Sequence, residues 1–456
     1  MSYSIQRRRY LLYSLVLGLY LIHVFLHWEV LLYITGILAI PALLLAFRTA
    51  TRLFQILGAV FIGAGIILFL YSGLSIREVP LFLTANMELL SFLAVLPWMN
   101  SVVRAGRFDR RINQLLRANV SDLGKLYTRG MITTYILVSF INLSALPLSQ
   151  HVLLENIAKV KKTVQESFIS RTTLRAFTLA LAWSPMEIMV AITIDSTGIG
   201  YLTYLPWLLL CSLLMLVLDA WKGRKGFQSY PYEPAGRGLN RRLPARSLVL
   251  QIIQLFTALA VFLGIVVVIG NRSGLNFILT VTFVIVPFSC VWAAVIGRWR
   301  SFRVVGWEMW KRRTNGMQNF VVLFLSLGFF SSSLNETPFL EMIRYPFVAA
   351  SDYPLIILLL IQYTYLGLSM AGVHPIATVG VLIEVLPPLY HVMNPMSIGM
   401  VLITGALATG AVGTYGITVT MTAQNTRQNP YKITGRNMPF AILYGSVGTL
   451  IGYLLL

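Results

Sequence analysis

Long apolar stretches recur along almost the whole 456-residue chain, from about Tyr10 to Leu456. Hydrophobic residues make up 57% of the sequence, charged residues only 11%, and the mean hydropathy is +0.75. A transmembrane helix needs about 20 mostly apolar residues to cross about 30 Å of hydrocarbon. We therefore predict an all-α polytopic membrane protein with about 10–13 transmembrane segments.

Basic residues cluster in short loops between the apolar stretches. They fall at residues 7–9, 104–129, 222–246, 298–313 and 427–436. Cytoplasmic loops of membrane proteins carry an excess of Lys and Arg, so we expect all five loops and the N-terminus on the cytoplasmic side. No small-residue cleavage site follows the first apolar run, which we interpret as a retained helix. The absence of a large soluble insert favours the bacterial inner membrane.

The net charge of +20 follows from these loops and not from one basic surface. We expect contact with anionic lipid headgroups and no nucleic-acid partner. The two cysteines, Cys211 and Cys290, lie in apolar segments, where small hydrophobic side chains are expected, and neither a disulfide framework nor a metal site is indicated. No nucleotide-binding or hydrolase motif is present, and we expect no cofactor.

The sequence "LALAWSPMEIMVAI" places a helix breaker and an acid inside an apolar run. Read as one helix, residues 171–198 would cross the membrane once and place the basic loop 222–246 outside, against the positive-inside rule. Pro185 removes a backbone donor and disfavours helix at Ser184. The freed carbonyls would be costly in lipid, so we predict a broken or re-entrant helix at Ser184-Pro185, buried in protein or lining water.

A similar Pro-bearing stretch, "LSMAGVHPIATVGVLIEVLPP", follows later in the chain. Aligned on Pro185 and Pro375, each copy has a breaker followed by an acid, and each is preceded by a basic loop, one clear span and a polar outer segment, expected at 151–175 and 335–352. We therefore predict two pseudo-repeats with broken or re-entrant helices. The expected domains are N-terminal transmembrane helices, repeat 1 with its break at Ser184-Pro185, a linking transmembrane pair, and repeat 2 with its break at His374-Pro375, at residues 1–100, 101–247, 248–297 and 298–456.

Paired interrupted helices at corresponding places in two halves are typical of a transporter substrate site. Ionisable groups inside a span are expensive and point to function; the acids well within apolar segments are Glu88, Glu187, Asp195 and Glu384. Glu187 follows the first break, where free N–H groups favour an anion. The oxygen-rich sequence from Asp195 to Gly198 suits a hard cation such as sodium. A capping carboxylate and an interfacial helix end are the structural alternatives.

The predicted break at His374-Pro375 offers other chemistry. His374 titrates near neutral pH and suits proton coupling or anion binding, although a histidine satisfied within the bundle is equally compatible. "TGALATGAVGTYGITVTMT" packs glycines and hydroxyls into a span, which suits either tight helix packing or an unwound segment facing the substrate. The expected substrate-binding residues are Ser184, Glu187, His374, Thr378, Thr414 and Tyr415, and the expected ion-coupling residues are Glu187, Thr193, Asp195 and Glu384.

Two pseudo-repeats, each with a broken helix near a turn containing Ser, Thr, Gly or Pro, resemble the ion-transporter superfamily of divalent anion, citrate, arsenite and TRAP-type large permeases. The resemblance covers roughly residues 100–456 and is architectural. It implies a substrate and sodium held between hairpin tips and unwound helices, at positions 184–187 and 374–378, and a transport domain that moves against a scaffold. The Ser-Asn-Thr motifs of the anion symporters are missing. The charge pattern gives repeats of like orientation, whereas that superfamily has inverted ones.

The leading hypothesis is an ion-gradient-driven secondary transporter of a small anionic solute, coupled to sodium or protons. A second hypothesis is a flippase or exporter of a lipid-linked anionic substrate, gathered by the amphipathic segment 107–126. A third is a transferase or polymerase acting on polyprenyl-linked sugars, with Glu29 or outer acids as catalytic groups; its outer loops would be unusually short. The sequence leaves the oligomeric state open, with a homodimer as one arrangement.

Overall fold

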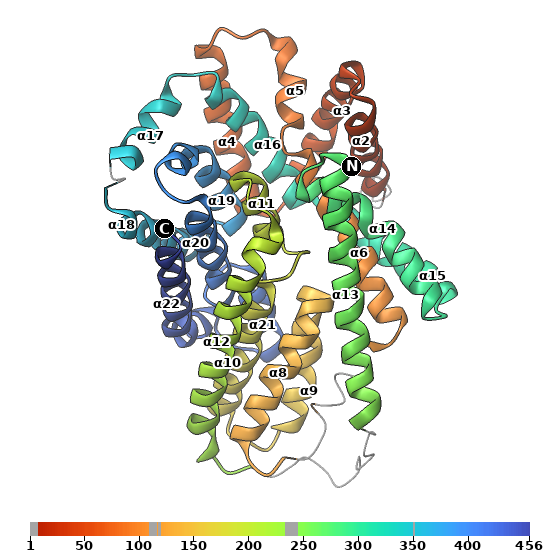
Figure 1. Ribbon diagram of the computed structural model, residues 1–456, viewed down its shortest axis with the longest axis vertical. Helices are drawn as coiled ribbons and strands as arrows, with labels where there is room; N and C mark the ends of the chain where they lie inside the picture. The colour runs from red at the N-terminus through yellow and green to blue at the C-terminus, as the bar shows by residue number, and fades with distance from the viewer. Residues whose placement is uncertain (1–7, 109–115, 117–119, 233–244, 350–351) are drawn as a thin grey trace. The chain divides into compact units, whose positions relative to one another are not determined.

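The computed structural model describes residues 8–108, 116, 120–232, 245–349 and 352–456 (Figure 1). Every regular element in these ranges is a helix. Within them, eight helices are long and apolar enough to cross a membrane, or nine if the bent pair α15 (Trp299–Asn315) and α16 (Gln318–Asn335) forms one span. Shorter apolar helices account for further segments. The prediction of an all-α polytopic membrane protein with broken helices is confirmed.

Contacts between helices divide the chain into two compact units that do not follow chain order. Unit 1 comprises Met1–Val102, Val268–Ala350 and Gly380–Leu389, and unit 2 comprises Val103–Val267, Ser351–Val379 and Tyr390–Leu456. Among the described residues, three α-helices are shared between the units: α6 (Met87–Ala105), α13 (Ala245–Ser273) and α19 (Pro375–Val385). The four domains expected from the sequence were defined by the predicted repeats, whereas these units are defined by contacts between helices. The four domains therefore stay a prediction.

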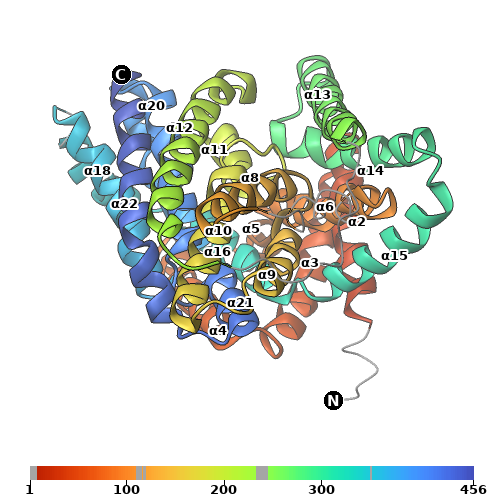
Figure 2. The same cartoon turned by 90° about the horizontal axis from the view of Figure 1, so that it is seen from below.

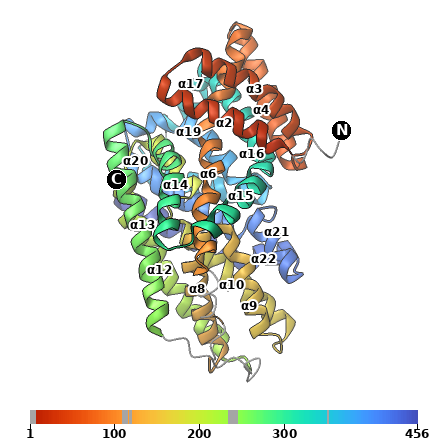
Figure 3. The ribbon, with the colours of Figure 1, turned by 90° about the vertical axis from the view of Figure 1, so that its right-hand side faces the viewer.

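Unit 1 is built around α16, which packs against α3, α4 and α5. Figure 3 shows α4 beside α16. Phenylalanines fill this contact: the ring of Phe329 lies 5.9 Å from that of Phe69 and 6.4 Å from that of Phe82. The unit also contains the bent partner of α16, α15, and its remaining helices have these bounds: α2 (Arg9–Leu26), α3 (Glu29–Phe47), α4 (Arg52–Tyr71), α5 (Val79–Thr84), most of α6 (Met87–Ala105), α14 (Phe277–Val295) and α17 (Phe339–Ala349).

The first half of unit 2 begins with a helical hairpin, α8 (Leu123–Ile141) and α9 (Ala145–Asn156), which lie side by side in Figures 1 and 3. The hairpin leads into α10 (Lys162–Leu181), α11 (Ile188–Thr197) and the long α12 (Tyr201–Gln228). The Asn156 side chain donates a hydrogen bond to the carbonyl of Leu116, which precedes α8. The chain therefore returns to the side on which α8 began.

This return corrects one expectation. Residues 151–175 were expected as a polar outer segment, but His151 lies on α9 and Arg175 lies buried on α10. The cause is the turn between α8 and α9, where Asn142 adopts a φ of 45°. Asn tolerates this left-handed region better than most residues, and the turn needs neither Pro nor Gly. The apolar pattern alone does not mark it.

The second half of unit 2 has the same order of elements. It contains α18 (Pro354–Met370), the start of α19, α20 (Pro395–Ala408), the short η5 (Thr409–Ala411), α21 (Ile417–Thr426) and the long α22 (Pro430–Leu454). α18, α20 and α22 all pack against one another, and Figure 2 shows these three helices together. Small residues allow the close approach: a Cβ added at Gly448 of α22 would clash with the Thr404 side chain of α20. Such small-residue contacts are typical of helix packing in membranes.

This contact predicts a local effect of side-chain volume on stability. Gly448→Val overpacks the α20–α22 interface, because Thr404 is β-branched and cannot move aside, and should lower the free energy of unfolding by about 1–3 kcal/mol. Gly435→Val lies on the same helix with nothing within 4 Å of its added Cβ, and should change stability by less than about 0.5 kcal/mol. Thermal unfolding of both purified variants in detergent measures the difference. Equal stability of the two variants would contradict this packing.

Candidate functional site

The first break lies between α10 and α11, at residues 182–187. α10 ends at Leu181 and α11 begins at Ile188, so Ser184 and Pro185 stand in the interruption, as the sequence predicts. The Ser184 hydroxyl accepts a hydrogen bond from the Met186 N–H at 3.4 Å. Ser184 is buried, 3% exposed, so the break lies inside the protein.

Neighbouring helices hold the first break in place. The Tyr201 hydroxyl, at the start of α12, donates a hydrogen bond to the Trp183 carbonyl, which the break leaves without a helical partner. The Trp183 indole N–H donates to the Tyr135 hydroxyl of α8 at 2.6 Å. That hydroxyl lies 2.8 Å from Ser212 Oγ on α12, which donates to the Leu179 carbonyl at 2.7 Å. A continuous chain of hydrogen bonds thus joins α8, α10 and α12 at the break.

The turn of the α8–α9 hairpin meets the first break. Glu187 stands immediately before α11 with extended backbone. Its carboxylate faces the Asn142 side chain and the backbone N–H groups of Ile188 and Met189. The first N–H groups of a helix have no partner within the helix. The arrangement brings an acid, an amide and a helix N-terminus to one place.

The second break lies between α20 and α21, at residues 409–416. η5 and the segment after it replace regular helix where Gly410, Gly413 and Gly416 occur. Thr418 donates a hydrogen bond to the Gly410 carbonyl at 2.6 Å, and Thr434 of α22 donates to the Val412 carbonyl at 2.9 Å. Each break is therefore supported by the long helix that follows it, α12 in one case and α22 in the other.

The turn between α18 and α19 meets the second break. Gly372 in this turn has a φ of +95°, which L side chains rarely adopt, and its added Cβ would lie 3.3 Å from the Tyr415 ring. An added Cβ at Gly413 would lie 2.7 Å from Ser369 Oγ near the end of α18. Both breaks thus have a turn of a preceding helix pair against them.

The two broken helices run side by side in opposite directions. α11 packs on α20, whereas α10 packs on η5 and α21. At residue level, Gly399 of α20 lies against Thr193 of α11, and Gly410 lies against Thr178 of α10. Because α11 and α21 both begin at a break, their N-termini point from opposite directions toward the same region of unit 2.

The predicted site residues divide between several surroundings. Ser184 and Glu187 lie at the first break. Thr414 and Tyr415 lie at the second, where the Thr414 hydroxyl is 3.0 Å from that of Thr434 and the Tyr415 hydroxyl is 2.7 Å from that of Tyr431. Their roles in binding stay a prediction.

The α18–α19 turn carries two more of the predicted residues. His374 Nδ1 accepts a hydrogen bond from the Ile376 N–H at 3.2 Å. Thr378, on the first turns of α19, is buried, and its hydroxyl has no partner among the described residues. Pro375 opens α19, whereas Pro185 interrupts α10–α11. The repeats aligned on these two prolines stay a prediction; the structure places one proline at the start of α19 and the other between α10 and α11.

The predicted coupling residues are dispersed. Thr193 and Asp195 lie on α11, where the Thr193 hydroxyl donates to the Met189 carbonyl at 2.8 Å. Glu384 belongs to the part of α19 in unit 1. Glu88 also belongs to unit 1, where it accepts a hydrogen bond from Asn276 at 2.8 Å.

A buried ion pair was missed by the sequence analysis. Arg175 Nη1 of α10 lies 2.5 Å from Asp219 Oδ1 of α12, and both side chains are almost fully buried. The Tyr127 hydroxyl donates to the other Asp219 oxygen at 2.6 Å, and Arg175 Nε donates to Asn437 Oδ1 of α22 at 2.9 Å. Four helices of unit 2 therefore meet at one pair of charges. The signal in the sequence was the acid in "LLMLVLDAW", which also lies in an apolar run.

Comparisons with known proteins show the fold. No protein-family model and no curated protein matches the sequence. A solved structure, MtrF of Neisseria gonorrhoeae, is similar with a TM-score of 0.58 and 11% sequence identity, over 87% of this chain and 94% of that chain. MtrF is described as illuminating a class of antimetabolite efflux pumps. This chain therefore has the fold of a membrane transporter.

The ion pair between Arg175 and Asp219 predicts non-additive effects on stability. Arg175→Met leaves the Asp219 charge buried without its partner and should cost about 3–5 kcal/mol of unfolding free energy. The double variant Arg175→Met, Asp219→Leu removes both charges and should recover most of that loss.

The matched control is Lys125→Met, because Lys125 pairs with Asp122 at 3.4 Å with its side chain 49% exposed. This variant should change stability by less than about 1 kcal/mol. Thermal unfolding of the wild type, Arg175→Met, Asp219→Leu and the double variant measures the cycle, with Lys125→Met beside it as the control. Additive losses in the double variant would show that the two charges do not depend on one another.

Proposed function

We propose that this chain is a secondary active transporter of a small anionic solute, driven by an ion gradient, with the solute bound between the two broken helices of unit 2. The observation that carries the proposal is the pair of helix N-termini, of α11 and α21, that point toward one region from opposite directions. A helix N-terminus carries partial positive charge and free N–H groups, and it favours anions. Interrupted helices of this kind present such ends to solutes in transporters.

The order of elements supports an alternating-access mechanism. A helix pair with a turn, a broken helix and a long helix follow one another twice in unit 2, as α8 to α12 and as α18 to α22. We infer that these are two repeats of opposite orientation, because their broken helices are antiparallel. In this proposal the repeats expose the site first to one side and then to the other. The inverted arrangement replaces the like orientation expected from the loops, and it agrees with the ion-transporter superfamily.

Glu187 is the coupling residue that this arrangement favours. An anionic solute at the N-terminus of α11 would be repelled by an ionised Glu187, so a proton on this carboxylate would accompany the solute. Sodium coupling through Asp195, Thr193 or Glu384 is the alternative.

MtrF is described as an efflux pump, which makes export from the cytoplasm the first direction to test. The proposed location is the cell membrane, with the N-terminus cytoplasmic, and the proposal does not depend on whether the protein is a homodimer.

Transport of a lipid-linked anion is the second candidate. Half of the segment on which it depended, 107–126, falls outside the described residues. Glu29, the catalytic candidate of the third hypothesis, is exposed at the start of α3, and no second acid is described beside it.

Uptake by proteoliposomes tests the proposed function. The wild-type protein, with an imposed proton or sodium gradient, should accumulate at least one member of a panel of small carboxylates. Glu187→Gln should abolish gradient-driven accumulation, because the side chain keeps its shape and loses its exchangeable proton. Accumulation that survives this substitution would refute the coupling role of Glu187.

A matched control is Glu155→Gln, on the exposed end of α9, where Glu155 Oε1 lies 3.1 Å from His151 Nε2. This variant should transport as the wild type does. Asn142→Ala should weaken solute binding by about tenfold if its amide helps to hold the anion. Failure of every carboxylate in the panel, together with transfer of a fluorescent lipid-linked phosphate between leaflets, would favour the second candidate instead.

A further inference from the structure

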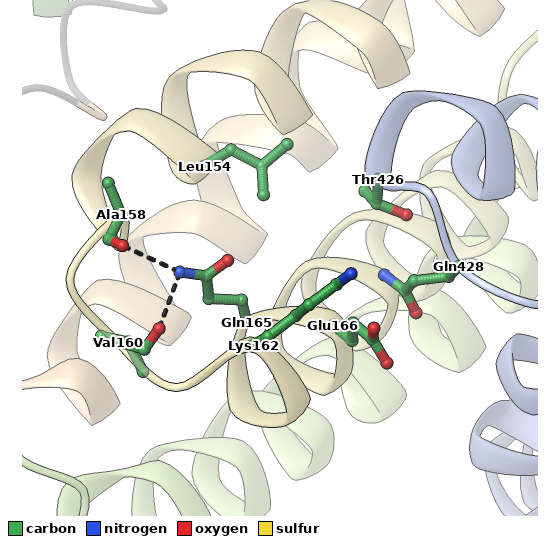
Figure 4. Close-up of a pocket in the computed structure, with 8 residues that line it drawn as sticks. All are labelled: Leu154, Ala158, Val160, Lys162, Gln165, Glu166, Thr426 and Gln428. Carbon is green, nitrogen blue, oxygen red and sulfur yellow. Dashed lines mark hydrogen bonds between the residues drawn. The ribbon is translucent and has the colours of Figure 1, made fainter.

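A cavity of about 320 Å³ lies in unit 2, away from both breaks. It is lined by the end of α9, the loop after it, the start of α10 and the segment that joins α21 to α22 (Figure 4). α8 and α22 begin on this side of the unit, next to the basic segments 104–129 and 427–436. The positive-inside rule assigns this side to the cytoplasm.

The first donor in the cavity is the Gln428 amide. Gln428 is 7% exposed. Its Oε1 accepts a hydrogen bond from Arg436 Nη1 at 3.0 Å, which fixes the orientation of the amide. The amide nitrogen Nε2 is buried and has no partner among the described residues. A buried donor without a partner is unfavourable, so a ligand that accepts a hydrogen bond from Nε2 would recover that cost.

The second donor is Lys162. Figure 4 shows the nitrogens of Lys162 and Gln428 pointing toward one another. Two donors that face each other leave a place for an acceptor between them. The nearby acid, Glu166, does not fill it, because its Oε2 lies 3.2 Å from Arg436 Nη2. Lys162 is exposed to solvent, and no ion pair of its ammonium group is found among the described residues that line the cavity.

The rest of the cavity offers one acceptor and an apolar wall. Gln165 Nε2 donates to the carbonyls of Ile157, Ala158 and Val160, at 2.9, 3.1 and 2.7 Å. Its Oε1 is consequently directed away from that loop, and Figure 4 shows it on the side of Leu154 and Thr426. A ligand with a carboxylate, a hydrogen-bond donor and a small apolar group matches these features.

Polar groups continue from the cavity toward the breaks. Gln150 of α9 donates to Thr173 of α10 at 3.1 Å and to Thr422 of α21 at 2.8 Å, and it accepts from Asn425 at 2.9 Å. The hydroxyl of Thr178 on α10, beside Gly410, is buried without a partner among the described residues. Hydroxyl and amide groups thus lie along α9, α10 and α21 between the cavity and the second break.

We propose that this cavity is a second binding site, which holds the carboxylate of a small solute between Lys162 Nζ and Gln428 Nε2. Its role as the entry site on the cytoplasmic side rests on the proposed transport function. Its binding chemistry does not, because Lys162, Gln165 and Gln428 define the site without reference to either break.

Protection of an introduced thiol tests the binding. Ala158→Cys places a thiol at the exposed edge of the cavity, in a Cys290→Ser background in which Cys211 is buried. The probe is N-acetylglycine, which has a carboxylate, an amide N–H and a methyl group; N-acetylglycinamide is the neutral control. At ten times its dissociation constant, N-acetylglycine should slow maleimide labelling by about tenfold, and the neutral amide should not.

Two neighbouring lysines provide matched variants. Lys162→Gln should weaken protection by at least about tenfold, whereas Lys161→Gln, exposed and outside the cavity, should leave it unchanged. Equal labelling with and without N-acetylglycine, or equal effects of the two lysine substitutions, would overturn the proposal. Protection in a protein that transports no carboxylate would sustain the site and refute the transport function. Transport of a carboxylate by a protein whose thiol is not protected would support the transport function and refute the second binding site.

Discussion

The structure of unit 2 depends on the backbone polar groups that interrupted helices release. Lipid offers these groups no hydrogen bonds, so irregular backbone at membrane depth must find its partners inside the protein. Tyr201 provides one for the Trp183 carbonyl at the first break, and Thr434 provides one for Val412 at the second. These partners come from α12 and α22, and the breaks can exist only while those long helices pack against them.

The same constraint connects the fold to its proposed use. Where a break is supported on one side by a hydroxyl, the following helix begins on the other, and at α11 the first N–H groups, of Ile188 and Met189, face the Glu187 carboxylate. The antiparallel packing of α11 on α20 and of α10 on α21 brings two such helix starts to one region. A single helix N-terminus attracts an anion only weakly, whereas an anion between two opposed N-termini is attracted by the partial positive charge of both. The repeated order of elements is what makes two opposed breaks possible.

The sequence predicted those features that a single residue encodes. Pro185 marks the first break because it removes a backbone donor, and the glycines from Gly410 to Gly416 mark a segment that is indeed unwound. It did not predict the α8–α9 turn, where Asn142 takes a positive φ and the turn itself, residues 142–144, contains neither Pro nor Gly. Nor did it predict the pairing of Arg175 with Asp219, because the two residues are 44 positions apart and only the packing of α10 against α12 brings them together. Local signals report where a helix ends, and they carry no information about which helix lies opposite.

The most direct test of the account is a cross-link between the two broken helices. An added Cβ at Gly410 would lie 3.3 Å from Thr178 Oγ1, the atom whose place the sulfur of a cysteine at position 178 would take. The two β-carbons then come close to the separation of about 3.5–4.5 Å that a disulfide needs. In a protein with Cys211→Ser and Cys290→Ser, the pair Thr178→Cys with Gly410→Cys should therefore oxidise readily, as seen by joined fragments after proteolysis between them. The pair Thr193→Cys with Gly410→Cys should stay reduced. Oxidation of the second pair in place of the first would contradict the antiparallel arrangement on which the binding site depends.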